Sequence, residues 1–355
     1  AGIEDATRAI VFPFTATSMM PSRLLAGSMT WPPFNSRSYL DCPYRQALSA
    51  SARIPSLIFF LFAPRAGASG KYTACCQLVK TLLVRPGAIG DFIVSLPALE
   101  CLRTEYSEVW CADRNVPLSG AFDRARSIAS TGLDLAGLEG VEPPPSLFEA
   151  LAGFDSIVSW YGTNRPEFRS AMLEAGLPFR FFPALPPLGA ACHAVDYYLE
   201  QAASIRACNA AVRVPRIHCP RTPGNFAVIH PFSGSTRKNW PLDRFRMLAD
   251  WLGQRMPVLW CAGRDEPLDS AVRFDNLYEL ACWLASARLF IGNDSGISHL
   301  AAAAGTPSVV IFGPTEPRVW APRGECVQIV KTKTPGEAIE AVDVSDVMRA
   351  VAPLC

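Results

Sequence analysis

The chain has 355 residues, of which half are apolar and 18% are charged, so it is long enough for two domains with their own cores. A net charge of +1 excludes the basic excess of a general nucleic-acid-binding protein, and we expect no nucleic-acid partner. Twelve cysteines are scattered through apolar segments without a CxxC pair. This pattern favours a reduced, cytoplasmic protein with buried thiols over a disulfide framework or a metal site.

Residues 1–77 differ from the rest of the chain in composition. They contain seven prolines and seven basic residues against three acidic ones, and neither a helical nor a strand period persists in them. We therefore predict a disordered extension. Its apolar run at 54–63 (IPSLIFFLFA) is shorter than the roughly 18–20 residues that span a bilayer.

Strands and helices alternate from residue 78 onward, which predicts two doubly wound parallel sheets. In the first half we expect strands at 77–85, 107–111 and 156–161 and helices at 91–104 and 193–206. In the second half we expect strands at 225–230, 257–261, 287–291 and 308–312 and helices at 241–254, 277–287, 297–304 and 338–351. A Pro- and Arg-rich stretch at 212–223 is the expected linker. The predicted domains are therefore 78–215 and 222–355.

Ligands of doubly wound sheets bind outside the carboxyl ends of the strands, so polar residues at those ends are site candidates. The first such end reads RPGAIGD, residues 85–91, in which glycines permit a tight turn and Asp91 stands at a helix start. Asp91 could equally be a plain helix cap worth about 1 kcal/mol. The turn lacks a full GxGxxG, which makes a nicotinamide site a weak alternative.

Two strand ends in the second half also carry polar residues. The segment SGSTRKN, residues 233–239, offers Ser235, Thr236 and Lys238, which suit a diphosphate, although a solvated loop is the alternative. The carboxylates of Asp265 and Glu266 could accept ribose hydroxyls or lie in an exposed turn.

The segment GNDSGISH, residues 292–299, is the most informative candidate. It places Asp294, Ser295 and Gly296 at the start of a small-residue helix, with His299 one turn further on. Helix N-termini attract anions, above all phosphates. The alternatives are a capped helix on a close-packed strand pair and, for His299, a core histidine.

Three motifs occur in order along the chain. They read LLVRPGAIGDFIVSLPALECLR at 82–103, HPFSGSTRKNWPLDRFRMLADWL at 230–252 and NLYELACWLASARLFIGNDSGISHLAAAAGTPSVVIFGPTEP at 276–317. Together they resemble the ADP-heptose:lipopolysaccharide heptosyltransferase family, glycosyltransferase family 9. The resemblance covers residues 78 to about 325.

The resemblance implies a GT-B architecture, in which two Rossmann-like domains face a cleft. It implies inverting transfer of heptose from ADP-heptose to an inner-core sugar of lipopolysaccharide, with neither a metal ion nor another cofactor. Asp91 falls on the catalytic base, Lys238 on the cation beside the leaving diphosphate, and Asp294 on the contact to the donor sugar. Ser295, Gly296 and His299 fall on the phosphate-facing helix start. The implied partners are a nucleotide-sugar donor and a glycolipid acceptor, which a cytoplasmic enzyme would meet at the inner membrane surface.

The chain departs from the family pattern on the nucleotide side. Only about ten residues separate Glu266 from Asn276, so we expect a helix beside the nucleotide pocket to be trimmed. A transferase for another nucleotide sugar and acceptor, or a catalytically silent nucleotide-sugar-binding protein, therefore stays open. On the acceptor side, three arginines could either meet an anionic acceptor or line a solvated face, namely Arg165, Arg169 and Arg180.

Overall fold

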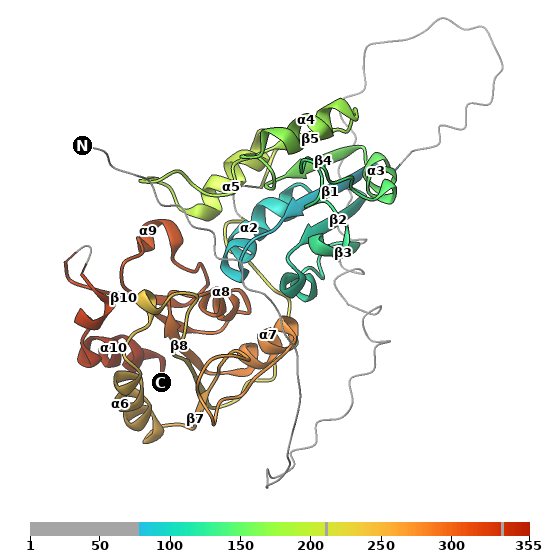
Figure 1. Cartoon of the computed structure of the whole chain (residues 1–355). Helices are drawn as coiled ribbons and strands as arrows, with labels where there is room; N and C mark the ends of the chain where they lie inside the picture. The colour runs from blue at the N-terminus through green and yellow to red at the C-terminus, as the bar shows by residue number, and fades with distance from the viewer. Residues whose placement is uncertain (1–77, 210–211, 335–336) are drawn as a thin grey trace, which may run out of the picture. The chain divides into compact units, whose positions relative to one another are not determined.

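The computed structural model of the protein describes residues 78–209, 212–334 and 337–355. The predicted disordered extension at 1–77 lies outside these described residues. Two parallel sheets follow one another along the chain, the first coloured cyan to green and the second yellow to red in Figure 1. The expected α/β class is therefore confirmed. Within the described ranges, no helix is both long and apolar enough to cross a membrane.

The first sheet has the strand order β3-β2-β1-β4-β5, which is that of a Rossmann fold. Its strands are β1 (Lys80–Arg85), β2 (Tyr106–Cys111), β3 (Arg124–Ser127), β4 (Ser156–Ser159) and β5 (Phe179–Phe181). The α-helices between and after them are α2 (Ile89–Cys101), α3 (Pro145–Ala152), α4 (Pro166–Glu174) and α5 (Ala194–Ala203). Short 3₁₀ helices η2 (Asp113–Leu118) and η3 (Ile128–Ser130) flank β3.

The second sheet has the order β10-β9-β8-β6-β7. Its strands are β6 (Ala227–His230), β7 (Val258–Trp260), β8 (Leu289–Asn293), β9 (Ser308–Phe312) and β10 (Val327–Lys331). Its helices are α6 (Leu242–Gly253), α7 (Leu277–Ser286), α8 (Gly296–Ala303), α9 (Pro317–Trp320), α10 (Val344–Val351) and the 3₁₀ helices η4 (Thr236–Lys238), η5 (Ile339–Ala341) and η6 (Ala352–Leu354). The predicted linker at 212–223 contains neither a helix nor a strand. The exact domain boundaries stay a prediction.

Successive strand residues point to opposite faces of the sheet, and this alternation builds the core. In β1, Leu83 packs with α2 and α5, whereas Leu82 and Val84 pack against α3 and α4. The cluster around Leu83 also contains Phe290 of the second sheet together with residues of α7 and α8. One continuous apolar cluster therefore joins the two sheets.

The predicted strands and helices are present, and the differences lie mostly at their ends. Helix α2 begins at Ile89, so Asp91 occupies the third helical position instead of opening the helix. Gly292 and Asn293 belong to β8, and the predicted turn shrinks to two residues. Several short elements were not predicted, because they contain too few residues to show a repeating pattern of apolar side chains. They are β3, α3, α4, β5, α9 and β10.

A disulfide joins Cys101, at the end of α2, to Cys208, after α5. The prediction of reduced thiols throughout is therefore wrong for this pair. The error has a physical reason, because the two cysteines lie 107 residues apart in sequence and become neighbours only when α5 packs on α2. Spacing along the chain carries no signal for such a pair.

We predict that Cys208→Ser lowers the free energy of unfolding by about 2–4 kcal/mol, because the bond closes a long loop and restricts the unfolded chain. Denaturant unfolding without reductant measures the change. Cys326→Ser, which removes an exposed free thiol, is the matched control and should unfold like the wild type. If reductant leaves wild-type stability unchanged, the bond does not stabilise the protein.

Candidate active site

A pocket of about 450 Å³ lies at the carboxyl ends of the strands and takes its walls from both halves of the chain. The first half contributes Ala88, Gly90, Asp91 and Leu185. The second half contributes Gly234, Ser235, Lys238, Asp294, Ser295, Gly296, His299, Thr315 and Trp320. Residues some two hundred positions apart in the sequence thus meet around one cavity.

The turn between β1 and α2 presents Asp91 to the pocket. Gly87 has a φ of +132°, which L side chains rarely adopt, and a Cβ there would lie 3.2 Å from that of Asp91. The Asp91 carboxylate accepts the Ala88 N–H at 3.2 Å through Oδ2. The cap interpretation is thus partly correct, since the side chain satisfies a helix-terminal N–H while lining the pocket.

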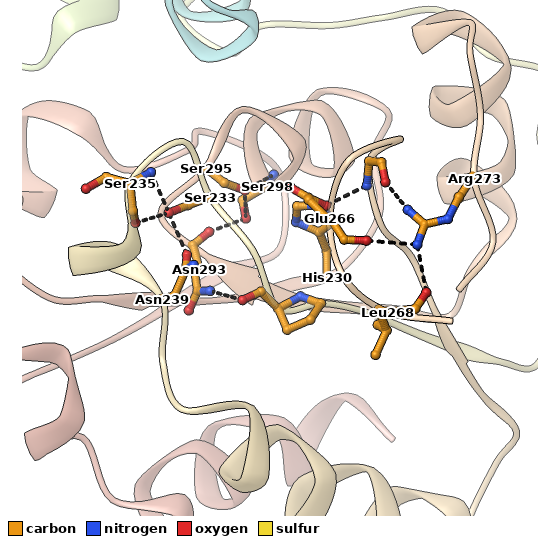
Figure 2. Close-up of polar contacts among 12 residues, drawn as sticks. His230, Ser233, Ser235, Asn239, Glu266, Leu268, Arg273, Asn293, Ser295 and Ser298 are labelled. Atoms are coloured by element: carbon orange, nitrogen blue, oxygen red, sulfur yellow. Dashed lines mark hydrogen bonds and ion pairs between the residues drawn. The ribbon is translucent and has the colours of Figure 1, made fainter. Parts of the chain in front are cut away.

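Helix α8 directs its N-terminus into the same pocket. Ser295 is its N-cap and accepts the Ser298 N–H at 3.3 Å through Oγ. The Ser298 hydroxyl donates to the Asn293 carbonyl at 2.5 Å, and the Asn293 amide donates to the Pro231 carbonyl at 2.8 Å. These bonds, drawn in Figure 2, tie the helix start to the end of β8 and to the following loop of β6.

The charged pair in the second half of the pocket is Lys238 with Asp294. The Lys238 ammonium donates to Asp294 Oδ2 at 2.7 Å, and the carboxylate side chain is only 6% exposed whereas the lysine is 33% exposed. A buried carboxylate needs a partner, and this lysine provides it. Because the lysine keeps an open side, it can also face an anion in the pocket.

Helices α2 and α8 approach each other through glycines. A Cβ on Gly296 would lie 2.7 Å from Ile89 Cβ and 3.1 Å from the Gly90 nitrogen, and a Cβ on Gly90 would lie 3.2 Å from His299 Cδ2. Side chains at these positions would force the helices apart. The glycines therefore allow two helix N-termini to line one cavity.

His299 is buried where the two helices meet. Burial lowers the pKa of His299 to about 4, against the opposing influence of the Asp294 carboxylate and a hydrogen bond to the Trp320 backbone. The imidazole is therefore neutral at pH 7. A neutral histidine can donate one hydrogen bond from the wall of the pocket, but it adds no positive charge there.

A second polar network lies at the end of β6 and β7, as Figure 2 shows. Glu266 Oε2 lies 3.1 Å from His230 Nε2 and accepts the Gly263 N–H at 2.5 Å. Burial raises the pKa of Glu266, but His230 and Gly263 lower it more, so it lies below its ordinary value. Arg273 donates to the carbonyls of Gly263, Glu266 and Leu268. The Glu266 carboxylate thus stabilises the conformation of the loop in which it lies.

The pocket brings together most of the predicted site residues, which are Asp91, Ser235, Lys238, Asp294, Ser295, Gly296 and His299. Thr236 and Asp265 are exposed and do not line it, and Glu266 belongs to the neighbouring network. Their predicted roles in donor binding are untested. No helix lies between β7 and α7, and the place of this segment beside a nucleotide stays a prediction.

Two of the three acceptor-side arginines, Arg165 and Arg169, have structural contacts. Arg165 donates to Tyr161 Oη at 2.6 Å and to the Ala136 carbonyl at 3.1 Å, and the Arg169 guanidinium lies 5.4 Å from the Phe181 ring centroid. The hydrogen bonds of Arg165 therefore stabilise the local structure, whereas Arg180 is exposed.

Sequence reasoning missed the buried residues behind the pocket. Arg85, Asn115 and Tyr198 are all at most 1% exposed and form polar contacts around the Asp91 turn. Arg85 stood in a recognised motif, but the other two lie in segments without one, and only the tertiary fold places them there. Among the described residues, no group of three or more His, Cys, Asp or Glu side chains could hold a metal ion.

The two parallel sheets and the shared pocket define a GT-B protein. Solved structures with the same architecture include a glycosyltransferase family 9 protein from Veillonella parvula, with a TM-score of 0.62 at 16% identity over 78% of this chain and 97% of that one. They also include E. coli heptosyltransferase WaaC with ADP, with a TM-score of 0.60 at 17% identity over 78% of this chain and 100% of that one. At these identities the likeness shows the fold alone.

Sequence comparison finds similarity to one family in part of the chain. Residues 190–346 match the model of glycosyltransferase family 9 (heptosyltransferase). Lipopolysaccharide heptosyltransferase 1 of Salmonella typhimurium is 30% identical over 115 residues, which are 28% of this chain and 36% of that protein. Lipopolysaccharide heptosyltransferase 3 of E. coli is 33% identical over 115 residues, 28% and 33% respectively. The family model matches the second half of the chain, and the alignments span about a third of the length of these curated relatives.

We predict that Gly296→Ala destabilises the protein by about 1–3 kcal/mol, because the added methyl group meets α2 backbone that cannot move away freely. Denaturant unfolding measures the effect. Gly253→Ala is the matched control, since nothing lies within 4 Å of a Cβ at that helical position. Equal stability of the two variants would contradict the close approach of the helices.

We predict that the protein loses stability as the pH falls from about 6.5 to 4. The unfolded His299 binds a proton near 6.5 and the folded one only near 4, so protons favour the unfolded chain in this window. The full loss is on the order of 3 kcal/mol. His299→Gln should flatten this part of the curve, whereas His218→Gln, at an exposed histidine, should not. Identical curves for both variants would contradict the buried, neutral state of His299.

Proposed function

We propose that this protein is an inverting, metal-independent glycosyltransferase that moves heptose from ADP-heptose to an inner-core sugar of lipopolysaccharide. The match of residues 190–346 to the model of glycosyltransferase family 9 supports the reaction class. The single observation that carries the proposal is the pocket itself, in which the Asp91 carboxylate from one half faces Lys238 and the α8 N-terminus from the other. An acid-base group and an anion site on one cavity are what transfer from a sugar diphosphate requires.

The reaction needs one base and one stabilised leaving group. Asp91 takes the proton of the acceptor hydroxyl while that oxygen forms a bond to the anomeric carbon. The bond from this carbon to the diphosphate oxygen breaks, and its electron pair leaves with the diphosphate. Attack from the face opposite the leaving group inverts the anomeric centre, so the base must lie across the pocket from the phosphate site.

The departing diphosphate is stabilised from the second half of the pocket. The α8 N-terminus lines the cavity through Ser295 and Gly296, and the N–H groups of a helix start favour negative charge. Lys238 adds a full positive charge and stays oriented by Asp294, 2.7 Å away. Asp294 retains free carboxylate capacity for donor-sugar hydroxyls. A helix end and a lysine can thus perform the charge stabilisation that other transferases assign to a metal.

The proposed donor and acceptor classes are taken from the similar proteins. One solved structure of E. coli WaaC is described with ADP and another with ADP-2-deoxy-2-fluoro heptose, and the curated relatives are lipopolysaccharide heptosyltransferases. We extend the nucleotide-sugar donor and the glycolipid acceptor to this chain as part of the proposal. A cytoplasmic enzyme acting on a glycolipid would work at the inner membrane surface.

One observation favours a second candidate, a transferase for another nucleotide sugar. The segment 261–276 contains no helix, and Glu266, the expected ribose contact, is bonded to His230 and Gly263. A different nucleoside could suit this shortened wall. Thermal shifts with ADP, UDP, GDP and their sugar conjugates distinguish the two candidates. The largest shift with ADP-heptose supports the first, and donor binding without turnover on any acceptor supports a silent binding protein.

We predict that Asp91→Asn lowers kcat at least 100-fold with ADP-heptose and a Kdo-bearing lipid A acceptor, because the amide cannot take the acceptor proton. Mass spectrometry of the product measures transfer. ADP binding should stay within twofold of the wild type, since the base lies opposite the diphosphate site.

The control is Asp243→Asn, which changes an exposed carboxylate paired with Arg246 on α6. It should transfer heptose like the wild type. Transfer by Asp91→Asn at the wild-type rate would show that Asp91 is not the base, and absence of ADP-heptose binding by the wild type would refute the proposed donor.

A further inference from the structure

Behind the Asp91 turn lies a buried cation that the proposed reaction leaves unused. Arg85 is the last residue of β1 and is only 1% exposed. It is among the largest fully buried side chains of the described residues. A guanidinium keeps its charge in proteins, and moving a charge out of water is costly unless it is well paired.

The partners of Arg85 are neutral oxygens. Nη2 donates to the Asp91 carbonyl and to Tyr198 Oη, each at 2.9 Å, and Nη1 donates to the Pro86 carbonyl at 3.4 Å. The guanidinium carbon lies 4.7 Å from the Tyr198 ring centroid, a cation–π distance. Within the described residues, Nε finds no hydrogen-bond partner. A buried guanidinium is normally stabilised by a carboxylate, and the hydrogen-bond acceptors of Arg85 include none.

These hydrogen bonds hold both ends of the turn that carries Asp91, the proposed base. Arg85 holds the carbonyls of Pro86 and Asp91, and Asn115 donates to the carbonyl of Gly87 between them at 3.1 Å. Asn115 is fully buried on η2 and its Oδ1 has no partner within the described ranges. Two buried polar side chains thus fix carbonyls of one short turn, and the Asp91 carboxylate keeps its place at the pocket.

Tyr198 connects this hydrogen-bond network to the rim of the pocket. Its hydroxyl accepts from Arg85 and donates to the Ala184 carbonyl at 2.8 Å. The next residue, Leu185, lines the pocket although it is 55% exposed. Arg85 therefore links the base turn, by way of one α5 side chain, to the loop between β5 and α5.

We propose that Arg85 is a positioning residue, whose buried guanidinium fixes the turn that carries Asp91 and, through Tyr198, couples that turn to the loop bearing Leu185. The inference rests on the proposed function for its kinetic consequence. Its structural content, a turn held by Arg85, does not depend on which sugar is transferred.

The test compares Arg85→Met, Arg85→Lys and Tyr198→Phe in the full chain. We expect Arg85→Met to lower kcat about 30- to 100-fold, because small displacements of a reacting group have effects of this size. Tyr198→Phe should lower kcat about 3- to 10-fold, and Arg85→Lys should recover part of the loss. The Kd for ADP should stay within twofold in all three, because the diphosphate site lies on the other half of the pocket.

Arg244→Met is the matched control. Arg244 on α6 also donates to main-chain carbonyls, one of them that of Val342 at 2.6 Å, but it lies outside the pocket. This variant should keep wild-type kcat even if it is less stable. A fall in kcat equal to that of Arg85→Met would show that lost stability, not lost positioning, explains the effect.

Two further measurements separate positioning from general damage. In an Asp91→Asn background, Arg85→Lys should change the residual rate less than twofold, since it acts through Asp91. Hydrogen exchange of the 86–92 segment should rise at least tenfold in Arg85→Met and stay unchanged in Arg244→Met. Unchanged exchange in Arg85→Met overturns the inference whatever the activity. If the wild type transfers no sugar, the proposed function fails. Hydrogen exchange of the 86–92 segment then tests by itself whether Arg85 holds the turn.

Discussion

The site depends on the contact between two glycines at the starts of α2 and α8. Because Gly296 has no Cβ, the Gly90 backbone can approach to a distance that any side chain would prevent. Two helix N-termini then share one cavity, and their positive ends repel each other unless negative charge lies nearby. Asp91 and Asp294 supply part of that charge, and Lys238 neutralises one of them. The proposed sugar diphosphate would place a further anion beside the α8 N-terminus and the open side of Lys238.

The neutral state of His299 fits the same electrostatics. A charged imidazole between two helix N-termini and beside Lys238 would add repulsion where burial already disfavours charge. Neutral, it packs against Gly90 and hydrogen-bonds to the Trp320 backbone. The histidine thus joins α8 to the end of α9 and leaves the balance of charge in the pocket to the two carboxylates and the lysine.

The fold and much of the site could be predicted because their signals are local. The β9 strand, Ser308–Phe312, is an apolar run that ends at glycine, and Asp294 and Lys238 stand in motifs at strand ends. The remainder depends on tertiary contacts. Asn115 is a single polar residue in a segment without a motif, yet it is buried beneath the turn that carries Asp91. The Cys101–Cys208 bond likewise exists only because distant helices pack together.

Helix α5 links the two halves of the site. Its N-cap His193 donates from Nε2 to the Ala321 carbonyl at 2.8 Å, and Asp196 forms a two-pronged ion pair with Arg323 at 2.5 and 2.9 Å. These bonds hold the segment next to Trp320, whose backbone contacts His299. On the same helix, Tyr198 bonds to Arg85 behind the base turn. A movement of α5 would therefore displace the proposed base, Asp91, and the proposed diphosphate site together, so the contacts of α5 couple the two sides of the pocket.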